Sequence, residues 1–227
     1  MNKHINNIWI VEVPQFAILL FIVFNTLAMI FYSGGTYLNN NNEGYSFIFN
    51  FLSDLGRTIS FSNKTNYISA FFFNSSLILS SIVFITFFYK IKNIFRTSND
   101  ILVLIGSIFG ICGGICLLGV GITPSNLYFH FHIIFANWIF RFFLCATLFF
   151  ILAIWKDNSI NNKANIGYLL FSVSIFIYIM ISEFGPNPQI NLIALNIQVV
   201  SQKIILIIFL IAIYIQTVEI KKIRNNE

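Results

Sequence analysis

Charged residues are scarce in this chain. Asp, Glu, Lys and Arg make up 9% of its 227 residues, whereas hydrophobic residues make up 57%. A soluble domain usually carries about 25% charged residues, so a compact water-soluble fold of this composition could not hide its apolar surface. A lipid bilayer removes that requirement, and the composition therefore predicts an integral membrane protein. No shift in composition along the chain indicates a second domain, so residues 1–227 are expected to form one unit.

Cysteine is rare as well, and its placement excludes a simple metal site. Cys112, Cys116 and Cys145 all lie inside apolar runs. Cys112 and Cys116 would share a face of a helix, but a zinc site needs two further ligands that nothing nearby supplies. We therefore predict buried free thiols that pack as small hydrophobic groups, with no metal and no cofactor.

Long apolar runs make up most of the sequence. A helix needs about 20 apolar residues to cross the bilayer, and six runs reach that length, near 14–33, 67–89, 101–122, 130–154, 165–184 and 192–218. The first run exceeds the apolar core of a signal peptide, so we expect an uncleaved span. The runs do not alternate in polarity, which excludes a β-barrel. The predicted fold is all-α, a polytopic bundle of about six transmembrane helices.

The basic residues indicate an orientation rather than a nucleic-acid surface. Short loops rich in Lys and Arg face the cytoplasm. With six spans, one side of the membrane carries Lys3, Lys90, Lys92, Arg96, Lys156, Lys163, Lys221, Lys222 and Arg224, whereas the other carries only Arg57, Lys64 and Lys203. Both termini are therefore predicted to lie on the cytoplasmic side of the cell membrane. The expected partners are membrane lipids and a small-molecule or lipid ligand. No binding to nucleic acid is expected.

Small residues recur along the third run. Gly106, Gly110 and Gly114 follow one another every four residues, with Gly113, Gly119 and Gly121 beside them. Small residues at this spacing allow close approach of a neighbouring helix in a membrane, where apolar contact gives no driving force. We predict that this helix is the packing centre of the bundle. A glycine-lined substrate path is the alternative.

The segment between the first two runs is predicted to contain an amphipathic helix at the membrane surface. Its apolar positions Ile48, Phe51, Leu52 and Leu55 follow the spacing of one helical face, and the polar positions Asn50, Ser53, Asp54 and Arg57 follow the same spacing on another. Two such faces are typical of an interfacial helix.

Polar residues inside apolar runs are candidates for function, because the membrane makes them costly. Arg141 lies near the middle of the fourth run, and His130 and Asn137 share its helical face. We expect His130 to face the interior and His132 to be rotated towards the headgroups. Glu183 is the expected counter-charge of Arg141, with Asp54 as the alternative.

The sixth run adds a further polar stripe, formed by Asn191, Gln198 and Gln202. Together these positions predict a polar cavity open to the outside. Its candidate ligand-binding residues are Ser53, Asp54, Arg57, His130, Asn137, Arg141, Glu183 and Gln198. The alternative is a network of hydrogen bonds and ion pairs that only holds the helices together.

Three short motifs carry a family resemblance. Ser53-Asp54-Leu55-Gly56, the turn from Gly121 to Pro124 and His130 at the start of the fourth run resemble the prokaryotic family called domain of unknown function 998, and more distantly the DRAM/Sfk-type membrane proteins. The resemblance covers most of the chain and implies six helices. By position it draws attention to Ser53, Asp54, Gly56, Pro124 and His130. It implies no activity, although the DRAM/Sfk-type proteins are associated with lipid and membrane homeostasis.

Three functions remain open, and the sequence favours a binding protein over an enzyme. In the first, Arg57 and Arg141 hold the head of a lipid or small anionic molecule in the cavity. The second is a small transporter in which Arg141 and Glu183 move as a pair. The third is an intramembrane hydrolase, with His130, His132 and Asp54 as metal ligands or with a Ser53–His130 pair.

Overall fold

The computed structural model describes residues 7–92, 101–156 and 163–225. It contains six long helices, α1 (Glu12–Ile30), α2 (Tyr67–Ile91), α3 (Ile101–Ile122), α4 (Phe129–Lys156), α5 (Lys163–Phe184) and α6 (Leu192–Asn225). Two short 3-10 helices, η1 (Asn7–Trp9) and η2 (Leu52–Gly56), complete the described elements. Lys3 and Arg96, which contributed to the predicted orientation, lie outside the described residues.

The prediction of a six-helix membrane bundle is confirmed. All six α-helices are long and apolar enough to cross a bilayer. The predicted first span differs in its bounds, because α1 begins before Pro14 and ends at Ile30. Pro14 lies in the first turn, where a helix tolerates the missing N–H. Helix α6 begins where the Asn191 side chain accepts a hydrogen bond from the Ala194 N–H at 2.9 Å, a normal N-terminal cap.

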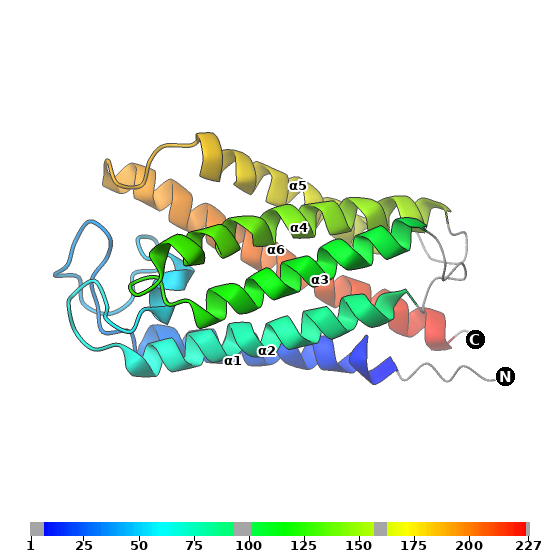
Figure 1. Ribbon diagram of the computed structural model, residues 1–227, viewed down its shortest axis with the longest axis horizontal. Helices are drawn as coiled ribbons and strands as arrows, with labels where there is room; N and C mark the ends of the chain where they lie inside the picture. The colour runs from blue at the N-terminus through cyan, green and yellow to red at the C-terminus, as the bar shows by residue number, and fades with distance from the viewer. Residues whose placement is uncertain (1–6, 93–100, 157–162, 226–227) are drawn as a thin grey trace.

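The helices form an up-and-down ring in chain order. Each helix packs mainly against its neighbours in the sequence, and the ring closes where α6 meets α1. Figure 1 shows α1 beginning and α6 ending at the same end of the bundle, and the connections α1–α2, α3–α4 and α5–α6 at the other end. We call the α1–α2 connection, residues 31–66, the cap segment, and its end of the bundle the cap end.

Helix α3 packs closely on both sides, as its glycines predict. A Cβ atom built on Gly110 would lie 2.3 Å from Cγ of Phe88 on α2, and one built on Gly113 would lie 2.7 Å from the Phe143 ring on α4. The glycines therefore serve two different neighbours. Helix α3 forms the two most extensive helix pairs of the bundle, with α2 and with α4, as expected of its packing centre, while it occupies one position in the ring.

The cap segment does not form the predicted amphipathic α-helix. Only the five residues of η2 are helical, and the polar residues Asn50 and Asp54 are as buried as the apolar residue Leu52. The reason lies in α6, which binds the backbone that a longer helix would use. Gln202 Oε1 accepts a hydrogen bond from the Leu52 N–H at 2.9 Å, and Lys203 Nζ donates to the Asn50 carbonyl at 2.6 Å.

Candidate functional site

A cavity lies inside the ring of helices, beneath the cap segment. Its volume is about 140 Å³, and an apolar cavity of about 150 Å³ is large enough for a benzene ring. Residues of η2 and of helices α2 to α6 line it: Leu52, Ser53, Phe73, Leu77, Leu117, Val120, His132, Ala136, Ile139, Phe140, Phe143, Phe171, Ile175, Gln202, Ile205, Leu206 and Phe209. Among the described residues, no Asp, Glu, Lys or Arg side chain belongs to this lining.

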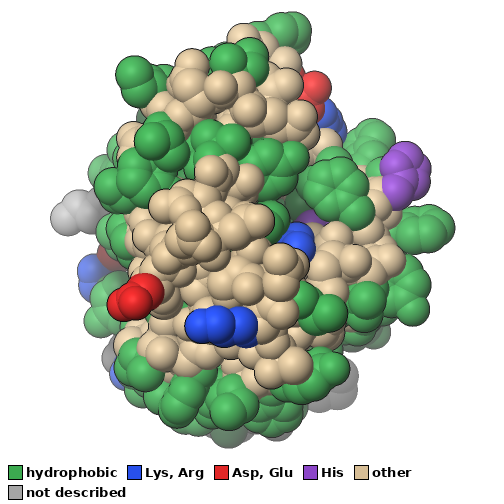
Figure 2. Space-filling model, turned by 90° about the vertical axis from the view of Figure 1, so that its left-hand side faces the viewer, with side chains coloured by type: hydrophobic (Ala, Val, Ile, Leu, Met, Phe, Trp, Pro, Cys, Tyr) green, Lys and Arg blue, Asp and Glu red, His purple; other side chains and the backbone are tan. Residues whose placement is uncertain are grey.

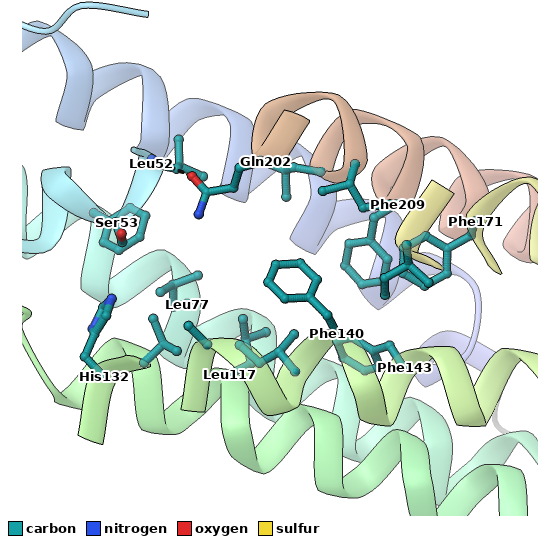
Figure 3. A pocket seen from close by; sticks show the side chains of 17 residues that line it. Leu52, Ser53, Leu77, Leu117, His132, Phe140, Phe143, Phe171, Gln202 and Phe209 are labelled. Carbon is teal, nitrogen blue, oxygen red and sulfur yellow. Dashed lines mark hydrogen bonds between the residues drawn. The ribbon is translucent and has the colours of Figure 1, made fainter. Parts of the chain in front are cut away.

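The cavity has one polar end and one apolar end. Figure 3 shows Ser53, Gln202 and His132 towards the cap, and the rings of Phe143, Phe171 and Phe209 at the far end. The Phe209 ring contacts both of the others, with centroids 5.4 Å from Phe143 and 4.9 Å from Phe171. A polar end that continues into an aromatic chamber of this volume matches a molecule with a small polar head and one short hydrocarbon tail.

His132 has a fixed ring orientation. It lies in the first turn of α4, and its Nδ1 is 2.7 Å from the carbonyl oxygen of Thr123, just after the end of α3. A carbonyl oxygen can only accept, so Nδ1 carries the hydrogen and donates it, and in the neutral ring Nε2 keeps a free lone pair. That Nε2 is buried and has no hydrogen-bond partner among the described residues.

The other two polar side chains of the cavity also have unused capacity. Gln202 uses its Oε1 to accept the Leu52 N–H, whereas no hydrogen bond from its Nε2 to the described residues is present. In Figure 3 that nitrogen points into the cavity. Ser53 is half-buried in η2, and its hydroxyl likewise has no hydrogen bond within the described part of the chain. The polar end thus presents a donor, an acceptor and a hydroxyl that can be either.

The expected orientation of the two histidines is wrong. His130 is exposed and lines no part of the cavity, whereas His132 is only 3% exposed. The spacing argument placed His130 on the face of Asn137 and Arg141, but that face of α4 does not meet the cavity. Hydrogen bonding to the end of α3 turns His132 inward instead. This contact between two helix ends could not be read from helical periodicity.

Arg141 has the partner that the sequence indicates. Its Nη2 lies 2.5 Å from Glu183 Oε1 on α5, and its Nη1 donates to the Asn137 carbonyl at 2.8 Å. The side chains of Arg141 and Glu183 are 33% and 40% exposed, and neither lines the cavity. Arg141 and Glu183 therefore connect α4 to α5 at a distance from the candidate site, and their use as the moving pair of a transporter stays a prediction.

Asp54 and Arg57 belong to contacts within the cap segment. Asp54 accepts a hydrogen bond from Asn50 Nδ2 at 3.1 Å. Burial raises the pKa of its carboxyl to about 6, although Asn50, Arg57 and Lys203 oppose that shift. Arg57 lies over the Phe61 ring, 4.0 Å from its centroid. The predicted residues thus separate into clusters and do not line one polar cavity.

Gln198 closes the turn between the last two helices. Its Nε2 donates to the carbonyls of Ile181, at 2.7 Å, and Pro186, at 3.3 Å. The Ile181 carbonyl also accepts the Gly185 N–H, so Gln198 adds a second hydrogen bond there and joins α6 to the end of α5 and the turn that follows it.

Sequence reasoning missed the side chains that fix the cap segment. Lys203 is buried, donates to the Asn50 carbonyl and lies over the ring of Phe47, 5.0 Å from its centroid. Asn66 Nδ2 holds the carbonyls of Leu55 and Arg57. A lysine inside the apolar run of α6 was the available signal, because a charge at such a position needs a partner.

The cap end shows few charges. Figure 2 views this end of the molecule, where backbone and uncharged polar groups cover the middle and hydrophobic side chains surround them. Among the described residues, no group of three or more His, Cys, Asp or Glu side chains could hold a metal ion. His130, His132 and Asp54 are therefore not brought together as a ligand set.

Comparisons with known proteins found no matching family model, no matching curated protein and no matching solved structure. The resemblance to the domain of unknown function 998 family stays a prediction.

Proposed function

We propose that this multi-pass membrane protein binds a neutral single-chain amphiphile, with its head at Ser53, His132 and Gln202 and its tail among the phenylalanines. The observation that carries the proposal is the unpartnered, buried Nε2 of His132 at the polar end of the cavity. A buried polar atom without a hydrogen bond costs about 1–3 kcal/mol. A ligand hydroxyl that donates to Nε2 would recover that cost.

The charge of the head group follows from the lining. An anionic head would need a cation, but the described lining contains no Lys or Arg. Arg141 is paired with Glu183, and Arg57 donates to the Ile59 carbonyl and lies on Phe61. The proposal therefore keeps the lipid ligand expected from the sequence and replaces its anionic head with a hydroxyl-bearing neutral one.

Binding can be tested with a cavity-filling variant and a matched control on the same helix. The purified protein in detergent is titrated calorimetrically with a short-chain monoacylglycerol, and the fatty acid of the same chain length is titrated for comparison. Ala136→Phe places a ring in the cavity and should weaken binding at least about tenfold, a loss of about 1.4 kcal/mol. Leu148→Phe adds a ring on an exposed position of α4 and should leave the affinity unchanged. Equal affinities of these two variants would reject the cavity as the site.

We also propose that the cap segment faces the outside of the cell membrane and that both termini are cytoplasmic. The distribution of Lys and Arg supports this orientation. Asn41 and Lys221 are exposed at opposite ends of the bundle. In intact cells a membrane-impermeant maleimide should label Asn41→Cys and not Lys221→Cys. The reverse result would invert the topology.

A further inference from the structure

The three polar side chains of the cavity combine a nucleophile, a base and a hydrogen-bond donor. We infer that Ser53, His132 and Gln202 form an acyl-transfer site, at which the protein hydrolyses a single-chain ester of an alcohol. The inference rests on the proposed function, since it requires the same amphiphile in the same cavity. It adds a reaction to that binding site.

His132 has the features of a general base. Its Nδ1–H is held by the Thr123 carbonyl at 2.7 Å, which fixes the tautomer and aims the lone pair of Nε2 away from the α3–α4 turn. A carboxylate commonly orients the base in serine hydrolases, and a backbone carbonyl gives the same tautomer here. In Figure 3 the His132 ring extends towards Ser53. No direct hydrogen bond joins the two side chains, and catalytic hydrogen bonds of this kind are often long before substrate binds.

Ser53 and Gln202 supply the remaining two functions. The Ser53 hydroxyl is free of hydrogen bonds to the described residues and borders the cavity. It lies on η2, whose backbone is fixed by α6 through the bond between Gln202 Oε1 and the Leu52 N–H. The same bond orients the Gln202 amide, so that its Nε2–H group faces the cavity. A side-chain amide in this position can donate to the oxyanion that forms during acyl transfer.

The reaction balances without a metal or a redox partner. The Ser53 Oγ forms a bond to the ester carbonyl carbon while its proton passes to His132 Nε2 and Gln202 Nε2 donates to the carbonyl oxygen. The bond from that carbon to the alcohol oxygen then breaks, and the alcohol leaves with the proton from His132. Water attacks the acyl-serine, gives its proton to His132 and releases the fatty acid, and the Ser53 oxygen recovers the proton.

The apolar part of the cavity determines the substrate class. The rings of Phe143, Phe171 and Phe209 close its far end, and its volume of about 140 Å³ is that of a cavity for a benzene ring. The acyl group is therefore a short chain whose carbonyl lies at the polar end. The absence of Lys and Arg from the described lining favours a neutral ester, such as a monoacylglycerol, over a phospholipid.

An active-site label and hydrolysis of a monoacylglycerol test the inference on the full-length protein. A short-chain alkyl fluorophosphonate should modify Ser53, which peptide mass spectrometry identifies, and a short-chain monoacylglycerol should release its fatty acid. Ser53→Ala should abolish both signals, and His132→Gln should slow both by about 10²-fold or more, the usual contribution of a general base. Ser182→Ala and His130→Gln are the matched controls, because both residues are exposed and away from the cavity. Both controls should react like the unchanged protein.

The binding titration separates the two proposals. Ser53→Ala loses one contact to the ligand head and should bind monoacylglycerol no more than about tenfold more weakly. If it still binds in this range and only the unchanged protein hydrolyses the ester, the acyl-transfer site is supported. If the unchanged protein binds monoacylglycerol but neither hydrolyses it nor labels at Ser53, the acyl-transfer site is rejected and the binding function stands. Labelling at another serine also rejects the site. If Ala136→Phe and Leu148→Phe both lose binding, the proposed binding function is rejected, and the acyl-transfer site that rests on it is rejected as well.

Discussion

Adding one methyl group to α3 should destabilise the bundle, although the same change in α5 should not. In Gly110→Ala the new Cβ would lie 2.3 Å from Cγ and 2.4 Å from Cδ1 of Phe88. Carbon atoms are at optimal separation near about 3.5–4.0 Å, so the ring must move by more than about 1 Å. The contact is at Cγ, close to the backbone of α2, so a rotation of the ring alone cannot relieve it.

The surroundings of Phe88 make that movement costly. The side chain is buried, and its ring lies 6.0 Å from the rings of both Phe143 and Phe150 and 5.3 Å from that of Phe87. Overpacking of a dense core costs about 1–3 kcal/mol, and replacement of glycine by alanine inside a helix returns up to about 1 kcal/mol. Because several rings must shift together, we expect a net destabilisation of about 1–2 kcal/mol.

Gly167 provides the matched control in α5. A Cβ at this position would lie 3.4 Å from Ile215 Cγ2 and 3.5 Å from the Ala212 carbonyl, which are ordinary contacts. Gly167→Ala should therefore keep the gain in helix propensity and be as stable as the unchanged protein or more stable. The two variants are compared by thermal unfolding in detergent, with the labelling of the native cysteines as the measure of unfolding. If Gly110→Ala unfolds at the same temperature as Gly167→Ala, the packing argument is wrong.

Three further predictions concern charged groups. Burial raises the pKa of Asp54 from 3.8 to about 6, so between these pH values the folded protein retains a proton that the unfolded chain releases. The free energy of unfolding should therefore fall as the pH rises from about 4 to about 6. Asp54→Asn should lack this pH dependence in denaturation experiments. Lys203→Met removes a buried charged donor from the Asn50 carbonyl, should cost about 1.5–3 kcal/mol, and should increase amide exchange around residue 50. Glu183→Gln leaves Arg141 without its ion pair, and a double-mutant cycle with Arg141→Gln should give a coupling near the average of about 0.6 kcal/mol for contacts between membrane helices. A cycle with no coupling would contradict an energetic role for this ion pair.

Features that depend on one helix at a time could be predicted from the sequence. The six apolar runs locate the helices because a span needs a fixed length of apolar chain. The glycines of α3 indicate close packing, and Gly110 and Gly113 show it. Glu183 was the nearest acid for Arg141 inside the membrane, and the two side chains pair.

Features that depend on contacts between different elements could not be predicted from the sequence. The periodicity of residues 48–57 describes an amphipathic helix only if the backbone is free to form one, whereas Gln202 and Lys203 bind that backbone from about 150 residues away. The inward orientation of His132 likewise depends on a contact outside its own helix, with the carbonyl of Thr123 in the α3–α4 turn. Helical periodicity gives relative directions around an axis, but it cannot identify which direction meets a partner.

The ring arrangement of the helices has a consequence for assembly. Every helix packs mainly on the helix before it and the helix after it, so the bundle can form from successive helical hairpins as the chain is made. The cavity obtains its last wall only from α6, which also carries the Gln202 and Lys203 side chains that hold the cap segment. The enclosed cavity therefore exists only after the final helix has been inserted, and a chain that stops short of α6 would leave its polar end open to water.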